Sequence, residues 1–338
     1  MQNPAFLLTK WYEAEGRDLP WRRTRDPYKI WLSEIILQQT RIDQGTSYYH
    51  KFVELFPTVH DLAAAENDTV MKAWEGLGYY SRARNLHHTA KVVAETMDGT
   101  FPGTYQELMD LKGIGPYTSR AIGSIAFGNR AAVLDGNVFR VLSRYLADFR
   151  PIDAPATRKA FQQILDDWIQ NVDPAAFNQG MMDLGATICT PKKPSCPLCP
   201  VSMHCTAYKQ GSVLQLPVKA KKVKRSTVHL HFYLVERAGN YLIRKRPAKG
   251  IWPNLWEIPN HEVEEKTWKK AGDTEGELLG AFKHVLTHRD LMIKAYRTEN
   301  YPGEAGNEAI WVGRNGLKNY GFSRAVLKIF ERYLPDIS

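Results

Sequence analysis

Residues 106–125 read QELMDLKGIGPYTSRAIGSI and set the fold expected for the first part of the chain. The pattern predicts a helix, a tight Gly-Ile-Gly turn and a second helix, because Pro116 suits the first position of a helix. Gly113 and Gly115 let the backbone turn and present N–H groups beside the positive end of the second helix. We therefore expect a phosphate-binding cradle at these glycines, and a plain helical hairpin with a glycine cap is the alternative.

Length and charge narrow the class of protein. The chain has 338 residues, more than a single core usually supports, so we expect two main compact units. No apolar run approaches the roughly 18 residues of a membrane span, and the first residues do not resemble a signal peptide. We expect an intracellular monomer without membrane association, in the cytoplasm or nucleoid if bacterial. The net charge of +9 favours a polyanionic partner, although a basic enzyme without nucleic acid fits it too.

The periodicity of apolar residues changes along the chain. Residues 1–208 are predicted to form an all-α domain, with the helical hairpin at about 108–125. Residues 209–227, KQGSVLQLPVKAKKVKRST, are polar and basic, which is typical of a solvated linker. Residues 228–338 are predicted to form a small α+β module that begins with a β-hairpin and a Gly-Asn turn. The expected helices are Tyr28–Arg41, Thr69–Gly76, Ser81–Met97, Pro155–Asn171 and Ser323–Leu334, and the expected strands are 229–236, 241–246, 280–286, 291–297 and 309–312.

All four cysteines of the chain lie in one segment, residues 189–205, which reads CTPKKPSCPLCPVSMHC and is expected to form a loop. Six, two and five residues separate Cys189, Cys196, Cys199 and Cys205. Such a loop can bring four sulfurs around one centre, so a metal or cluster site is expected, with two disulfides as the alternative. The spacing alone leaves zinc and iron–sulfur open, and His204 is a further candidate ligand. Lys192 and Lys193 suit phosphate contact, as exposed lysines of any loop would.

Asp135 is a candidate catalytic carboxylate. It precedes the apolar helix expected from Val138, and the start of that helix favours its ionised form. A carboxylate that is fixed and ionised can stabilise positive charge that develops during a reaction. The alternative is that Asp135 only caps the helix.

Glu34 is the candidate general acid. It lies in WLSEIILQQT, residues 31–40, where its helical face is largely apolar. Such surroundings raise the pKa of a carboxyl group, so the acid can keep a proton for a leaving group near neutral pH. A solvated glutamate on the helix surface is the alternative.

These strings resemble a known family. The cysteine spacing and the helix-hairpin-helix with the following AAVLDGNVFRVLSRYL, residues 131–146, resemble the endonuclease III superfamily of DNA glycosylases. LPWR (19–22), WLSEIILQQT and WEGLGYYSRARNL (74–86) resemble the MutY-type adenine DNA glycosylases. The resemblance implies a [4Fe–4S] cluster in the loop. It also implies a substrate of double-stranded DNA in which adenine faces 8-oxoguanine or guanine.

The same resemblance assigns roles to individual positions. Glu34 would protonate adenine and Asp135 would stabilise or capture the sugar cation, with Tyr117 and Asn137 supporting Asp135. Positions that match the adenine pocket are Arg22 and Gln179, and positions that match residues inserted into the opened duplex are Gln39 and Tyr79.

Tyr117 also separates two groups of relatives. Strand-cleaving members of the superfamily carry a nucleophilic lysine there, and a phenol cannot form a Schiff base. The chain is therefore expected to be a monofunctional glycosylase, with weak strand scission at most from another lysine such as Lys112. The alternatives are a glycosylase/lyase for oxidised pyrimidines and a non-catalytic mismatch-binding protein.

Residues 228–338 resemble the C-terminal domain of the same glycosylases, which is related to the Nudix fold. The segment GIWPNLWEIPNHEVE, residues 250–264, leads toward a Nudix box, but the clustered glutamates of the box are absent. We therefore expect recognition rather than Mg²⁺-dependent hydrolysis. Leu286, Thr287 and His288 match the family's Phe-Ser-His loop that contacts 8-oxoguanine, keeping a hydroxyl and the imidazole but losing the aromatic ring. Ordinary strand and turn residues are the alternative.

Overall fold

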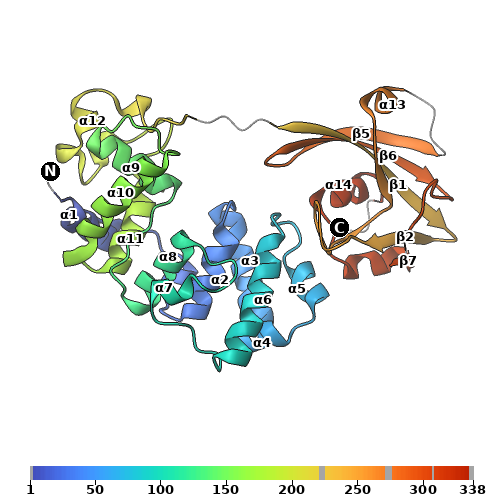
Figure 1. The fold of residues 1–338 in the computed structure, drawn as a ribbon, viewed down its shortest axis with the longest axis horizontal. Helices are drawn as coiled ribbons and strands as arrows, with labels where there is room; N and C mark the ends of the chain where they lie inside the picture. The colour runs from blue at the N-terminus through green and yellow to red at the C-terminus, as the bar shows by residue number, and fades with distance from the viewer. Residues whose placement is uncertain (1–2, 221–224, 271–275, 307, 335–338) are drawn as a thin grey trace. The chain divides into compact units, whose positions relative to one another are not determined.

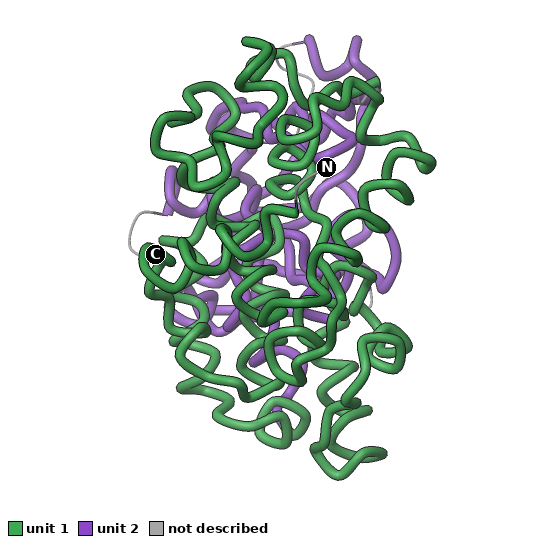
Figure 2. The backbone as a smooth tube through the Cα atoms, turned by 90° about the vertical axis from the view of Figure 1, so that its left-hand side faces the viewer, with its two compact units in different colours: residues 1–64, 85–222 green, residues 65–84, 223–338 purple. Residues whose placement is uncertain are grey.

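The computed structural model describes residues 3–220, 225–270, 276–306 and 308–334. The chain forms two compact units, shown in Figure 2. Unit 1 contains residues 1–64 and 85–222, and unit 2 contains residues 65–84 and 223–338. In the part of the chain that the structure describes, no helix is long and apolar enough to cross a membrane.

Unit 1 is helical, as the sequence predicts (Figure 1). Prolines in the first turn start α2, α8, α10 and α11, where a missing N–H costs no helical hydrogen bond. The helices are α1 (Ala5–Glu15), α2 (Pro27–Leu37), α3 (Ile42–Leu55), α4 (Val59–Ala64), α6 (Ser81–Thr96, which begins in unit 2), α7 (Tyr105–Leu108), α8 (Pro116–Phe127), α9 (Gly136–Leu146), α10 (Pro155–Trp168), α11 (Pro174–Asp183) and α12 (Thr206–Lys209).

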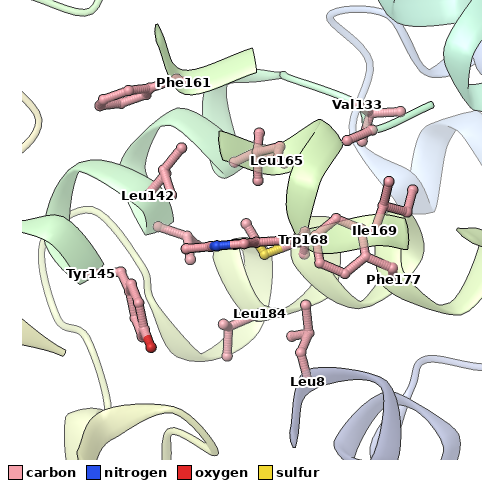
Figure 3. Packing of buried hydrophobic residues seen from close by; sticks show 14 of the residues in the cluster. Leu8, Val133, Leu142, Tyr145, Phe161, Leu165, Trp168, Ile169, Phe177 and Leu184 are labelled. Carbon is pink, nitrogen blue, oxygen red and sulfur yellow. The ribbon is translucent and has the colours of Figure 1, made fainter. Parts of the chain in front are cut away.

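A hydrophobic core lies between α9, α10 and α11 (Figure 3). Leu142, Phe161, Leu165 and Phe177 are completely buried in it. Each such side chain contributes about 1.5–3 kcal/mol of burial free energy. The core also includes Val133, so it holds the segment that leads to Asp135.

The predicted helical hairpin is present with a shorter first helix. α7 is a single turn, and a loop connects it to α8. Gly113 adopts a φ of 86°, which strains any residue with a side chain, and a Cβ there would lie 2.7 Å from the Cβ of Asn85.

The segment expected to be a solvated linker is largely packed on unit 1. Val213 and Leu216 are buried in a small cluster with Ala207. The carbonyl oxygen of Val218 accepts a hydrogen bond of 3.0 Å from the N–H of Ile152. The prediction of a solvated connector is therefore wrong for residues 209–218, because a few apolar residues within a polar stretch were enough to anchor it. Residues 221–224 lie outside the described residues.

Unit 2 contains a mixed sheet with the strand order β3-β2-β1-β6-β5, while β4 pairs with β1 and β7 with β2. β1 and β6 run parallel, from the pair Ser226–Arg289 to the pair Val235–Thr298. The final helix packs Val326, Ile329 and Phe330 into the core of the sheet, so the predicted α+β module is confirmed. The elements are β1 (Ser226–Arg237), β2 (Asn240–Lys245), β3 (Trp256–Glu257), β4 (Asn260–Val263), α13 (Glu265–Lys269), β5 (Glu277–Val285), β6 (Arg289–Thr298), β7 (Ala309–Gly313) and α14 (Arg324–Tyr333).

The turn of the β1–β2 hairpin differs from the prediction by one residue. Arg237 pairs with Asn240, so Ala238 and Gly239 form the turn rather than Gly239 and Asn240. Both turn residues have positive φ, 45° and 76°, as a two-residue hairpin turn of type I′ requires.

Residues 65–84, which include α5 (Asn67–Ala73), belong to unit 2 although unit 1 flanks them in sequence. The backbone of Phe322 explains the attachment. Its N–H donates to Glu75 Oε1 at 2.8 Å, and its carbonyl oxygen accepts from the Tyr80 hydroxyl at 2.9 Å. A single boundary near residue 209 therefore does not describe how the chain is divided.

Candidate active site

Glu34 lies on α2 and is 8% exposed. Asp26 caps this helix by accepting a hydrogen bond from the N–H of Tyr28, so the helix start is fixed. Burial raises the pKa of Glu34 to about 7; a hydrogen bond from Tyr117 opposes this rise and the negative charge of Asp135 adds to it. The interpretation of Glu34 as a solvated surface glutamate does not fit this environment.

Asp135 is the N-cap of α9. Its Oδ1 accepts from the N–H of Val138 at 2.8 Å, and its Oδ2 accepts from Asn137 Nδ2 at 3.0 Å. Burial raises the pKa of Asp135 above its ordinary value, and these hydrogen bonds hold the rise down. The helix start thus favours the ionised form as expected, but burial is the stronger influence.

Tyr117 interacts with both carboxyl groups. It is the second residue of α8, and its hydroxyl forms a hydrogen bond with Glu34 and lies 3.1 Å from Met182 Sδ. Burial raises its pKa well above the ordinary value, and the negative charges of Glu34 and Asp135 add to that effect. A neutral phenol, which cannot form a Schiff base, therefore lies beside Glu34.

Asn137 is held from two sides. Its Oδ1 accepts from Arg140 Nη2 at 2.8 Å, and the same Nη2 donates to the carbonyl oxygen of Gly185. A Cβ on Gly185 would come within 2.6 Å of the Asn137 Cβ, so only glycine permits this close approach. The side chain that donates to Asp135 is therefore fixed by its neighbours.

Asp183 is a residue that the sequence analysis did not single out. Its side chain is 1% exposed and accepts hydrogen bonds from Arg22 Nη1 and Nη2, at 2.6 Å and 2.7 Å. Arg17 forms a second ion pair with it. A signal did exist, because Asp183 follows Gln179 by one helical turn and so lies on the same face of α11.

The other predicted contact residues are distributed over the two units. Gln179 is buried on α11 and its amide donates to the carbonyl oxygen of Ala175, while Gln39 is exposed in unit 1 with a φ of 59°. Tyr79 is 52% exposed in unit 2, with a φ of 47°. Positive φ at two non-glycine residues is uncommon and often marks functional positions.

In unit 2, Tyr79 and Thr287 contact each other directly. Their hydroxyl oxygens are 3.0 Å apart, and both side chains are exposed. Thr287 lies in a tight turn closed by a hydrogen bond from the N–H of Leu286 to the carbonyl oxygen of Arg289. His288 lies in the same turn and is exposed. The structure thus brings one residue expected to insert into DNA together with the loop expected to contact 8-oxoguanine.

The four cysteines are free thiols that line one cavity, so the disulfide alternative does not hold. Arg144 is buried beside them, and its guanidinium donates to Cys189 Sγ at 3.3 Å and to the carbonyl oxygens of Thr190 and Pro191. Among the described residues, no three His, Cys, Asp or Glu side chains are gathered closely enough to hold a metal ion.

Comparison with known proteins identifies relatives of both parts of the chain. Residues 32–169 match the HhH-GPD superfamily base excision DNA repair protein model, and residues 230–332 match the NUDIX domain. The adenine DNA glycosylase of Buchnera aphidicola subsp. Schizaphis graminum is 34% identical over 341 residues, covering 96% of this chain and 97% of that protein. This chain belongs to the adenine DNA glycosylase family. The human adenine DNA glycosylase is 44% identical over 407 residues, covering 96% of this chain and 73% of that protein.

Two solved structures match the fold of part of the chain. A thermostable thymine-DNA glycosylase matches with a TM-score of 0.56 and 31% identity, covering 61% of this chain and 95% of that one. An endonuclease III–DNA complex matches the fold with a TM-score of 0.52 and 23% identity, covering 61% of this chain and 95% of that one. The member described here is therefore a DNA N-glycosylase with a helical glycosylase fold and a Nudix-like module, as the sequence predicts.

Proposed function

We propose that this glycosylase hydrolyses the N-glycosidic bond of adenine placed opposite 8-oxoguanine or guanine in duplex DNA. The observation that carries the proposal is the buried pair of Glu34 and Asp135, whose charges interact with each other and with Tyr117, the hydrogen-bond partner of Glu34. Adenine is a poor leaving group and requires a proton as it departs. An acid with a pKa of about 7 holds that proton under physiological conditions.

Asp135 stabilises the positive charge that develops on the sugar, or forms a covalent adduct with it. Its two oxygens are fixed by Val138 and Asn137, so the carboxylate is already oriented before the bond breaks. Tyr117 cannot form a Schiff base, and the reaction therefore ends with base release. Arg22 and Gln179 hold the flipped adenine, and Arg22 is kept in place by Asp183.

Separate elements bind the DNA backbone and recognise the bases. Gly113 and Gly115 bind a phosphate at the start of α8, and Gln39 and Tyr79 fill the stack that the flipped base leaves. The turn at residues 286–288 contacts 8-oxoguanine, and the Tyr79–Thr287 contact supports this assignment by coupling insertion to lesion reading.

The proposal includes a [4Fe–4S] cluster held by Cys189, Cys196, Cys199 and Cys205. The four thiols line one cavity, and both zinc and an iron–sulfur cluster accept four thiolates. The six-two-five spacing, which resembles the cluster loop of the endonuclease III superfamily, favours the cluster, and it would supply four iron–thiolate bonds that hold the loop together. The guanidinium of Arg144 offsets the negative charge of the thiolates. Measured iron, rather than zinc, in the purified protein would support this assignment, and zinc alone would overturn it.

The function is tested with duplexes that differ at one pair. Adenine release is measured under single-turnover conditions opposite 8-oxoguanine, guanine and thymine, together with release of an oxidised pyrimidine. We expect release of adenine opposite 8-oxoguanine and guanine only, and no covalent complex after borohydride treatment. Release of the pyrimidine with borohydride trapping would instead show a glycosylase/lyase, and DNA binding without any release would show a mismatch-binding protein.

A further inference from the structure

The segment that carries Asp135 into the site has an unusual support. Residues 131–135 lie outside the helices and strands, and four backbone groups of residues 131–133 bond to side chains. Ala132 donates its N–H to Asp166 Oδ1 at 3.1 Å, and its carbonyl oxygen accepts from Gln162 Nε2 at 2.9 Å. Both of these side chains come from α10.

Asn178 on α11 also forms hydrogen bonds to this segment. Its Oδ1 accepts from the N–H of Val133 at 2.9 Å, and its Nδ2 donates to the carbonyl oxygen of Ala131 at 2.9 Å. The same Nδ2 donates to Ser124 Oγ on α8 at 2.8 Å. The side chain of Asn178 is completely buried, so water cannot replace these bonds.

Asn178 therefore joins three parts of the site. It belongs to the helix that carries Gln179 and Asp183, it bonds to the helix that carries Tyr117, and it fixes the segment that ends at Asp135. Only Leu134 separates Val133, which is hydrogen-bonded to Asn178, from Asp135. A displacement of Val133 is consequently transmitted along the backbone to the carboxylate.

We propose that Asn178 is a positioning residue for Asp135. By bonding to the backbone on both sides of Ala132, it sets where the carboxylate stands against the sugar of the flipped nucleotide. This inference rests on the role proposed above for Asp135. Because transition-state stabilisation is sensitive to placement at the scale of about 1 Å, loss of the Asn178 amide should slow the reaction without removing any group that touches DNA.

The test compares two duplexes whose target nucleotide is replaced by an abasic analogue. One analogue is a cationic pyrrolidine that mimics the charged sugar, and the other is a neutral tetrahydrofuran. We expect the wild-type protein to bind the cationic duplex at least tenfold more tightly, because Asp135 faces the charge. Asn178→Ala should reduce this preference by about tenfold and slow single-turnover adenine release by about 10- to 100-fold. Its affinity for the neutral duplex should stay within twofold.

Two further variants keep the test decisive. Ser124→Ala removes the third partner of Asn178 but leaves both bonds to the segment, so its preference for the cationic duplex should match wild type. Asn178→Ser, which keeps a hydroxyl in the site, provides a milder variant if Asn178→Ala does not fold, and it should show a smaller loss in the same direction.

The outcomes distinguish a failure of the positioning role of Asn178 from a failure of the role proposed for Asp135. An unchanged cation preference in folded Asn178 variants, or an equal loss of affinity for both duplexes, overturns the positioning role. A wild-type protein without any preference for the cationic duplex contradicts instead the proposed role of Asp135.

Discussion

The proposed catalytic carboxyl groups of unit 1 and the proposed lesion contacts of unit 2 lie in opposite environments. Glu34 in unit 1 is 8% exposed, and burial dominates its pKa and that of Asp135. Tyr79 in unit 2 is 52% exposed, and its partner Thr287 is exposed as well. Desolvation shifts a carboxyl group into the pH range where it can act as an acid, whereas a neutral hydroxyl pair needs to be accessible to the DNA that it reads.

This contrast predicts where substitutions act. Changes in the buried site of unit 1 should affect the chemical step by orders of magnitude, because charges and protons there lack competition from water. Changes in the exposed pair of unit 2 should alter discrimination between opposing bases by a few fold. The following expectations test that division.

The largest effect is expected for Glu34→Gln. Glutamine fits the site but has no proton to donate, so the single-turnover rate of adenine release should fall by about 10³-fold or more. The dissociation constant for the duplex should remain within a few fold of wild type. Glu13→Gln, on the exposed side of α1, is the matched control and should leave the rate unchanged. A rate within tenfold of wild type would remove Glu34 from the mechanism.

Asp135→Asn should slow adenine release by about 10²- to 10³-fold. Asparagine is also a good N-cap, so α9 and the thermal stability should be preserved while the negative charge is lost. The measurement is the single-turnover rate with thermal unfolding alongside it, and Asp43→Asn on the exposed start of α3 serves as the control. Near-wild-type turnover would reduce Asp135 to a helix cap.

Glu34 should also make stability depend on pH. Its pKa rises from 4.5 to about 7 on folding, so the folded state holds the proton more tightly than the unfolded state. The stabilisation is complete below pH 4.5 and is lost as the pH rises to about 7. At pH 8, Glu34→Gln should therefore exceed the wild-type free energy of unfolding by up to about 3 kcal/mol, and the difference should shrink toward pH 4.5. Denaturant unfolding at the two pH values measures it, and an equal difference at both would contradict the buried environment of Glu34.

The smallest effect is expected in unit 2. Tyr79→Phe and Thr287→Val each remove one hydroxyl of an exposed hydrogen bond, which corresponds to about a 2- to 10-fold change. The quantity to measure is the ratio of adenine release opposite 8-oxoguanine to that opposite guanine. Both variants should lower this ratio, and the double variant should lower it no further than either one. Thr96→Val, which removes an exposed hydroxyl at the end of α6 in unit 1, is the control. A ratio unchanged in both variants would separate this pair from lesion reading.

Local signals in the sequence predicted much of unit 1. Three features were predicted correctly, and each depends only on residues within a few positions of it. They are the start of α8 at Pro116, the cap position of Asp135 and the apolar face around Glu34. Such signals depend on helix geometry and survive folding unchanged. For the same reason the sequence predicted an apolar helical face around Glu34 and a helix start at Asp135.

What the sequence did not reveal depends on distant contacts. The attachment of residues 65–84 to unit 2 rests on the backbone of Phe322, more than 200 residues away along the chain, and no local pattern encodes that contact. The ion pairs of Asp183 with Arg17 and Arg22 also join residues more than 160 positions apart in the chain. The anchoring of Val213 and Leu216 likewise required a hydrophobic site built by other segments.

The most direct test of the account is the pH dependence of adenine release by the wild-type protein under single-turnover conditions. Because Glu34 must be protonated to act, the rate should be highest below about pH 7 and should fall about tenfold per pH unit above it. Circular dichroism across the same range would show that the protein stays folded. A rate that is constant from about pH 6 to 9, or that rises through this range, would contradict a buried glutamic acid as the proton donor.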